Sequence, residues 1–266
     1  NSYHYTIEGV SATSLIAQLG CPFKCSFCSG RNSPFLRKIR TRSSISVVNE
    51  IEHLYLTYGL KGFMFYDDEL NVNKSMVQLM NMITDLQDKH GVEFMLRGFV
   101  KAELFNAKRN NLKVKALMSI GHAGESFESV ENTKKWLLEC EPEEFDCTII
   151  TTYPGSPYFD EAVKEGDNYV YTDTKNGDKL YQASLDYLIE QDYYKGDPDG
   201  GYTSYVWTDH MSAADLVSAR DELENSVRSA LNISFNPSRP GIKHEHSMGM
   251  GNVSLPDFIL KRAIKK

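Results

Sequence analysis

The sequence has no apolar stretch that approaches the roughly 18 residues of a membrane-spanning helix. Its first ten residues, NSYHYTIEGV, lack the basic and apolar regions of a secretory signal. Both absences predict a soluble protein without a membrane span. Positive charge is not in excess either, because the formal net charge is −7. We therefore expect no nucleic-acid partner that binds by broad electrostatic attraction.

Cysteine is scarce, and the five cysteines do not form an even, well-spaced set. A chain of 266 residues can bury a large core without disulfide bonds. An odd number of cysteines, three of them crowded together, is unlike a secreted disulfide scaffold. We therefore predict reduced thiols and a cytoplasmic protein.

One local run departs from the acidic balance of the chain. Residues 31–42, RNSPFLRKIRTR, are strongly basic. A solvated loop face explains this run, and so does a contact to phosphate or another anionic substrate.

Strands and helices alternate through the first part of the chain, as judged from apolar periodicity and from Ser and Gly at helix ends. The expected order is a buried strand over 12–20, a helix over 44–58, a strand over 62–68, a helix over 74–90 and a strand over 92–100. This alternation predicts a parallel sheet with right-handed crossovers.

The next strand, expected over 112–120, follows after only a short connection that includes NAKRNN. Parallel neighbours need a crossover of about a dozen residues or more, usually a helix. Either a hairpin turns at Arg109, Asn110 and Asn111, or a βα segment is missing near 106–111. We favour the missing segment, because the other connections are of the βα type. The pattern then resumes with a helix over 128–140 and a strand over 145–153.

Composition changes beyond about residue 166. Two Tyr-containing strands, NYVYTDT and KLYQASL, flank KNGD, and Asn-Gly is a strong hairpin signal. A helix over 213–231 follows, with Ser212 as its N-cap. We predict two regions, a barrel over 1–165 and an α+β accessory region over 166–266 that covers substrate.

Three cysteines, Cys21, Cys25 and Cys28, lie within the sequence GCPFKCSFCSGR. Crowded thiolates favour a shared soft cation, which compensates their charges. Tetrahedral zinc needs a fourth protein ligand, and none is evident. Cys140 and Cys147 lie far downstream, at positions whose pattern predicts burial. A four-iron, four-sulfur cluster on three thiolates leaves one iron open to bind a substrate or cofactor.

The form Cys-x-x-x-Cys-x-Phe-Cys, made by Cys21, Cys25, Phe27 and Cys28, resembles the signature of the radical S-adenosylmethionine superfamily. The resemblance implies a partial (β/α)6 TIM-like barrel, a 4Fe-4S cluster on these cysteines and S-adenosylmethionine on the open iron, beside Phe27. In this family an electron from the cluster cleaves the sulfonium to methionine and a 5′-deoxyadenosyl radical. That radical abstracts hydrogen from an unactivated carbon.

Further positions match the family pattern. Tyr66, Asp67 and Asp68, in YDDE after the second strand, resemble the place that holds the cofactor's ammonium, and carboxylates suit a cation. An exposed turn is the alternative. Arg97, in MLRGFV, resembles the third-strand position that addresses the carboxylate of cofactor or substrate.

Two later segments also match. Ile120 and Gly121 open IGHAGE, which resembles the loop that packs on adenine; an ordinary turn into the next helix is the alternative. TTYPGSPYFD resembles the last barrel strand and its loop, with Thr151 beside the cofactor and Tyr153 facing substrate as the predicted catalytic residue. The fourth strand, with its Gly-Glu-Ser-Gly-like cofactor contact, has no counterpart here. Its place would be the junction near Asn110.

Over nearly the whole chain, the closest resemblance is to the catalytic half of cobalamin-binding radical S-adenosylmethionine proteins, many of which methylate unactivated carbon or phosphorus. It is carried by ATSLIAQLGCPFKCSFCSGR, ALMSIGHAGES, TTYPGSPYF and HEHSMGMG. Cobalamin is implied only by these relatives, because Asp-x-His-x-x-Gly, the usual motif for its lower ligand, is absent.

Three functions therefore remain open. The first is cobalamin-dependent methyl transfer, which the resemblance favours. The second is a cobalamin-independent radical rearrangement, coupling or oxidation. The third is a non-enzymatic iron–sulfur or zinc protein. An enzyme of this family would need a small-molecule, lipid or peptide substrate and an electron donor such as flavodoxin or ferredoxin.

Overall fold

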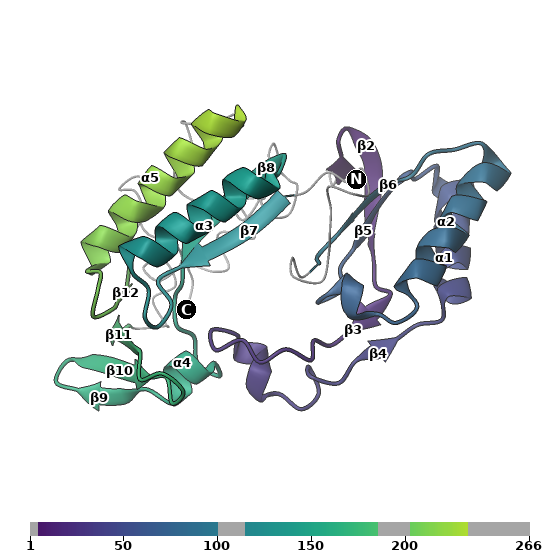
Figure 1. Cartoon of the computed structure of the whole chain (residues 1–266). Helices are drawn as coiled ribbons and strands as arrows, with labels where there is room; N and C mark the ends of the chain where they lie inside the picture. Colours follow the sequence, from purple (N-terminus) through teal and green to yellow (C-terminus); the bar gives the residue numbers. More distant parts are fainter. Residues whose placement is uncertain (1–4, 101–114, 186–202, 234–266) are drawn as a thin grey trace, which may run out of the picture. The chain divides into compact units, whose positions relative to one another are not determined.

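The computed structural model describes residues 5–100, 115–185 and 203–233 (Figure 1). These residues form two compact units. Unit 1 contains residues 5–19 and 40–100, and unit 2 contains residues 20–39, 115–185 and 203–233. Each unit has its own hydrophobic core. Both combine helices with strands, so the α/β part of the predicted fold class is confirmed.

Unit 1 is built on a four-stranded sheet in the order β1-β2-β5-β6. The strands are β1 (Thr6–Ile7), β2 (Val10–Leu15), β5 (Gly62–Phe65) and β6 (Met95–Gly98). The predicted parallel arrangement is confirmed for β2, β5 and β6. β1 was not predicted: it pairs antiparallel with β2 through a turn in which Glu8 and Gly9 both have positive φ.

Two helices cross between the parallel strands, as predicted. α1 (Ser44–Tyr58) begins at Ser43, whose side chain accepts a hydrogen bond from the Ser46 amide, and it ends at Gly59 in the left-handed conformation. α2 (Met76–His90) ends at Gly91 in the same way. The two helices lie side by side (Figure 1). The core between helices and sheet includes Val47, Ile51, Leu79, Ile83, Phe63 and Phe65.

The strand predicted over 12–20 is interrupted. Its last residues form a separate strand, β3 (Gln18–Leu19), which pairs antiparallel with β4 (Arg40–Thr41). The interruption falls at Ala17, because its amide donates to the Asp67 carboxylate instead of to a neighbouring strand. β3 and β4 bracket residues 20–39 in the sequence, which include the 3-10 turn η1 (Ser29–Asn32). A second 3-10 turn, η2 (Leu70–Val72), follows β5.

Unit 2 contains the parallel pair β7 (Lys115–Ile120) and β8 (Glu144–Ile149), joined by α3 (Phe127–Cys140). α5 (Ala213–Leu231) lies beside α3 (Figure 1). Ser212 is the N-cap of α5, as predicted, and forms a capping box with Asp215. The junction predicted to lack a βα segment, near 106–111, lies outside the described residues.

The second sheet of unit 2 is antiparallel, in the order β12-β11-β10-β9; we call it the accessory sheet. Its strands are β9 (Val163–Glu165), β10 (Asn168–Thr172), β11 (Lys179–Ala183) and β12 (Val206–Trp207). The hairpin predicted at KNGD is confirmed between β10 and β11. Tyr171, Leu180 and Val206 join one core with Ile149 and Leu216, so the accessory sheet shares a core with β8 and α5.

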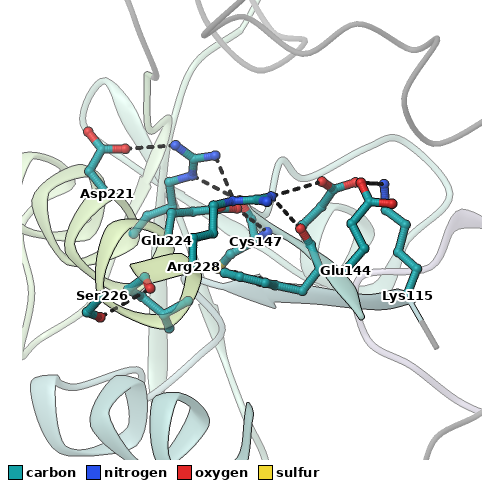
Figure 2. Close-up of polar contacts among 11 residues, drawn as sticks. Lys115, Glu144, Cys147, Asp221, Glu224, Ser226 and Arg228 are labelled. Carbon is teal, nitrogen blue, oxygen red and sulfur yellow. Dashed lines mark hydrogen bonds and ion pairs between the residues drawn. The ribbon is translucent and has the colours of Figure 1, made fainter. Parts of the chain in front are cut away.

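Polar side chains of α5 occupy hydrogen-bonding groups of β8 (Figure 2). The Glu224 carboxylate accepts from the Cys147 amide at 2.7 Å, and Arg220 Nε donates to the Cys147 carbonyl at 2.9 Å. Arg228 donates to the Phe145 carbonyl at 2.6 Å and to Glu224 at 2.6 Å. Within the described part of the chain, β8 pairs with β7 alone. α5 therefore covers a strand edge that would otherwise leave polar backbone groups unpaired.

None of the helices in the described residues is both long enough and apolar enough to cross a membrane.

Candidate functional site

Residues 20–39, which we call the cysteine loop, begin at a glycine that no other residue can replace easily. Gly20 has φ +94, and a Cβ there would lie 2.3 Å from the Lys38 carbonyl oxygen. The next amide, of Cys21, donates to the Leu36 carbonyl at 2.9 Å. A tight turn follows, in which the Cys28 amide donates to the Cys25 carbonyl at 3.1 Å. The backbone thus closes the loop on itself and brings its ends together.

Within the described residues, no disulfide involves Cys21, Cys25 or Cys28. Cys21 and Cys25 are partly buried and Cys28 is exposed. In the described ranges, no three His, Cys, Asp or Glu side chains gather in a way that would hold one metal ion. A four-iron cluster, however, takes separate thiolates on separate irons, so its ligands do not converge on one atom. The number and chemistry of these donors fit that group.

The two downstream cysteines differ from each other. Cys147 is 1% exposed, as predicted, and burial together with the nearby Glu224 carboxylate raises the pKa of its thiol to about 12. The prediction of burial was wrong for Cys140, which is exposed. It is the last residue of α3, where the helix ends at Glu141 in the left-handed conformation.

The cysteine loop contacts residues 151–160, TTYPGSPYFD, which we call the 151–160 segment. The Tyr158 amide donates to the Ser26 carbonyl at 3.0 Å. Asn32 Nδ2 donates to the Asp160 carboxylate at 3.0 Å and to the Gly155 carbonyl at 3.3 Å. Two of the segments singled out in the sequence therefore lie together in unit 2.

Phe27 connects the cysteine loop to IGHAGE. Its side chain is 43% exposed, and its ring centroid lies 5.4 Å from that of His122. His122 Nε2 lies 2.9 Å from Ser119 Oγ, and its ring lies 6.1 Å from that of Tyr158. Burial lowers the pKa of His122, while the Glu125 carboxylate counteracts this shift. Sequence reasoning missed His122, although this residue lies inside a quoted segment.

At the start of IGHAGE, Ile120 is buried in the core. Gly121 has φ +86, and a Cβ there would lie 3.1 Å from Ile149 Cγ2 and 3.2 Å from Val206 Cγ2. Its amide donates to Glu125 Oε2 at 2.9 Å. Close packing and a positive φ thus account for glycine at position 121 without any ligand. Contact of Ile120 and Gly121 with adenine stays a prediction.

In the 151–160 segment, Thr151 and Tyr153 are partly buried and Thr152 between them is buried. Thr152 Oγ1 donates to Gln182 Oε1 at 2.5 Å. The Tyr153 carbonyl accepts from the Ser156 amide at 3.0 Å and from its hydroxyl at 2.7 Å. Hydrogen bonds therefore hold the Thr152 side chain and the Tyr153 carbonyl in place.

Unit 1 carries the predicted ammonium and carboxylate contacts. Tyr66, Asp67 and Asp68 follow β5, and Arg97 lies in the neighbouring parallel strand β6, paired with Met64. Asp68 is exposed, whereas Tyr66 and Arg97 are partly buried. All four residues lie toward the carboxyl ends of adjacent parallel strands, where ligand sites of α/β sheets occur.

Asp67 has a structural contact that the sequence did not indicate. It is 1% exposed, and its Oδ1 accepts from the Ala17 amide at 2.7 Å. Its Oδ2 is buried and has no hydrogen-bond partner within the described residues. Burial raises the pKa of Asp67, and the amides of Ala17 and Gln18 counteract this shift. The side chain therefore fixes the backbone between β2 and β3.

Two arginines of the basic run donate to backbone carbonyls outside the run. Arg42 donates to the Ile16 carbonyl at 3.0 Å and forms an ion pair with Glu50 at 2.6 Å. Arg37 donates to the Pro22 carbonyl at 3.4 Å. At these two positions, positive charge is used within the protein, which neither alternative drawn from the sequence included.

No protein-family model matches the chain. Two curated proteins are similar in sequence. The uncharacterized methyltransferase PH0819 of Pyrococcus horikoshii is 25% identical over 201 residues, which are 60% of this chain and 44% of that protein. The anaerobic magnesium-protoporphyrin IX monomethyl ester cyclase of Cereibacter sphaeroides is 24% identical over 217 residues, which are 64% of this chain and 35% of that protein. The chain therefore spans less than half the length of these relatives.

A solved structure is also similar. It is the radical S-adenosylmethionine methyltransferase TsrM from Kitasatospora setae with tryptophan substrate and the analogue aza-SAM bound. The TM-score is 0.51 at 13% identity, and the match covers 85% of this chain and 52% of that chain. Another structure of TsrM, with cobalamin and a [4Fe-4S] cluster bound, matches 96% of this chain and 57% of that chain at 14% identity, with a TM-score of 0.49. The similarity to the tryptophan-bound TsrM structure indicates a related fold.

Proposed function

We propose that the chain is a radical S-adenosylmethionine enzyme, which binds a 4Fe-4S cluster and uses it to cleave S-adenosylmethionine; its cysteine motif, its two curated relatives and its fold similarity support this. A bound cluster of this kind supplies one electron to the sulfonium and so yields methionine and a 5′-deoxyadenosyl radical. The observation that carries the proposal is the cysteine loop itself. It offers three cysteines that no disulfide occupies in the described structure, and it packs against two other segments of the family pattern.

Each site residue has a role in this proposal. Cys21, Cys25 and Cys28 would hold the cluster, and the lack of a fourth thiolate leaves one iron for the cofactor. Carboxylates attract the cofactor's ammonium and a guanidinium attracts a carboxylate. The residues assigned to cofactor binding are Phe27, Tyr66, Asp67, Asp68, Arg97, Ile120, Gly121 and Thr151. Tyr153 is assigned to the substrate.

Methyl transfer with the help of cobalamin is the reaction we favour. Two of the similar proteins are methyltransferases by name. The part of cobalamin rests on the resemblance of the sequence to cobalamin-binding members of the superfamily. A second candidate is a radical cyclisation or oxidation without methyl transfer, because the other curated relative is a cyclase. The six-stranded partial barrel, the regions 1–165 and 166–266, the cytoplasmic location and the electron donor stay predictions.

The proposal is tested by product analysis. The chain is reconstituted anaerobically with iron and sulfide, and S-adenosylmethionine and a strong reductant are added. 5′-Deoxyadenosine and S-adenosylhomocysteine are then followed by chromatography, with and without methylcobalamin. We expect both products, the second only with methylcobalamin. Deoxyadenosine alone in both conditions would favour the second candidate. If the chain has bound iron and sulfide and still forms neither product, radical chemistry is contradicted.

A further inference from the structure

Tyr158 contacts three other segments of unit 2 through hydrogen bonds and ring contacts. It is 6% exposed and lies in the short helix α4 (Pro157–Asp160). Its amide donates to Ser26 in the cysteine loop at 3.0 Å, and its carbonyl accepts from Gln182 Nε2 in the accessory sheet at 2.6 Å. Its hydroxyl accepts from the Ala123 amide in IGHAGE at 3.3 Å. The polar groups of this residue are thus used by three separate segments.

The ring of Tyr158 belongs to a series of aromatic contacts. On one side it meets Tyr171 of β10, with ring centroids 4.8 Å apart in an edge arrangement. On the other side it meets His122 at 6.1 Å, and His122 meets Phe27 at 5.4 Å. These separations are those of favourable aromatic pairs. The series runs from the accessory sheet to the residue that precedes Cys28.

We propose that Tyr158 is a positioning residue, through which the accessory sheet holds the cysteine loop in place and sets the surroundings of the cluster. The part that concerns the cluster rests on the proposed function. Solvent exposure and hydrogen bonding around an iron–sulfur cluster tune its reduction potential. If the ring of Tyr158 is lost, His122 and then Phe27 lose their support, and solvent gains access beside Cys28.

Unit 1 offers a matched control. Tyr55 of α1 also makes edge contacts with a histidine and an aromatic ring, at 5.6 Å from His90 and 5.6 Å from Phe94. Tyr55→Leu therefore removes the same kinds of ring contact as Tyr158→Leu, and Tyr158→Phe separately removes the hydroxyl that accepts from the Ala123 amide. Any effect that follows only from a lost aromatic ring should appear in both variants.

The first measurement is hydrogen–deuterium exchange of the metal-free chain, read by mass spectrometry. Tyr158→Leu should speed exchange of the peptide over residues 21–33 by roughly three- to tenfold, whereas Tyr55→Leu should leave that peptide unchanged. Tyr158→Phe keeps the ring and should have a smaller effect. If Tyr158→Leu does not fold, His122→Ala carries the test, because it removes the link between Tyr158 and Phe27 while the hydrogen bonds of Tyr158 to Ser26 and Gln182 remain.

The second measurement uses the reconstituted chain. The reduction potential and the electron paramagnetic resonance spectrum of the reduced cluster should change in Tyr158→Leu and His122→Ala, and not in Tyr55→Leu. Exchange at 21–33 that matches the Tyr55→Leu variant would overturn the proposal, since Tyr158 would then be an ordinary core residue. A chain that never assembles a cluster, yet shows the expected exchange, would contradict the proposed function and leave the positioning role supported.

Discussion

At the scale of single residues, the five cysteines differ in their surroundings, and this difference predicts their reactivity. Cys28 and Cys140 are exposed, whereas Cys147 is buried and the pKa of its thiol is raised to about 12. The thiolate is the reactive form. Brief alkylation of the metal-free chain at pH 8, followed by mass spectrometry, should label Cys28 and Cys140 and leave Cys147 unmodified. Labelling of Cys147 before the chain unfolds would contradict its placement.

A second prediction separates the ligand cysteines from the others. Cys25→Ala should abolish binding of iron and sulfide and formation of 5′-deoxyadenosine together, because two thiolates do not hold the cluster. Cys140→Ala is the matched control, since it removes a thiol outside the cysteine loop and should retain both properties. Metal analysis and chromatography read the two outcomes. Cleavage of S-adenosylmethionine by Cys25→Ala would show that the cysteine loop does not hold the catalytic cluster.

Asp67 predicts a dependence of stability on pH. Burial raises its pKa above the usual 3.8, so the folded chain binds this proton more tightly than the unfolded chain. The resulting stabilisation is fully present below pH 3.8 and is lost as the pH rises through the raised pKa of the folded chain.

Urea unfolding at several pH values checks this sign. The free energy of unfolding of the wild type, minus that of Asp67→Asn, should fall as the pH rises above 3.8 and then level off. Asp85→Asn, at an exposed position on α2, is the control for a surface carboxylate. A difference that does not vary with pH for Asp67→Asn would mean that the buried carboxyl does not titrate differently on folding.

The candidate site could be predicted only where its signal is local in the sequence. Cys21, Cys25 and Cys28 are close neighbours, so their spacing alone indicates a shared cofactor. His122 and Tyr158 reach the cysteine loop through contacts between residues about 95 to 130 positions apart in the sequence, and no periodicity reports such contacts. The contact of Asp67 with Ala17 was missed for the same reason, because it joins residues 50 positions apart.

At the scale of elements, the docking of α5 on β8 predicts that removal of one carboxylate lowers the stability of the fold strongly. Glu224, with a side chain that is 4% exposed, accepts from the Cys147 amide and pairs with Arg220 and Arg228. Glu224→Ala would leave two guanidinium groups and a strand amide without this partner. Loss of one partner from a buried ion pair costs about 3–5 kcal/mol.

Thermal and urea unfolding measure this effect. Glu222→Ala on the same helix is the control, because the Glu222 side chain is 76% exposed and lies 3.9 Å from Lys134. It should change stability by about 1 kcal/mol or less. Equal effects of the two substitutions would show that the contacts between α5 and β8 are not specific stabilising contacts.

Helices were predicted more closely than strands, for physical reasons. α1 and α5 match the predicted ranges because their N-caps, Ser43 and Ser212, and the following apolar periodicity are local signals. β1 and β12 are two residues long and exist only through their partners, β2 and β11. A strand of that length has no periodicity to detect.

At the scale of the whole molecule, two compact units with separate cores predict separate responses to mutation. Ile83 lies in the core of unit 1, packed between α2 and the sheet, and is 1% exposed. Ile83→Ala deletes buried methyl groups and leaves a cavity, which costs about 2–5 kcal/mol. Because the two cores share no residue in the part of the chain that the structure describes, the loss should be confined to unit 1.

Hydrogen–deuterium exchange of the Ile83→Ala variant under native conditions tests this separation. Peptides from α1, α2 and β5 should exchange faster than in the wild type, while peptides from α3, β8 and α5 keep their rates. Glu224→Ala should give the reverse pattern, which makes each variant the control for the other. Faster exchange in both units from either substitution would mean that the chain unfolds as one cooperative body, and that the two cores stabilise each other.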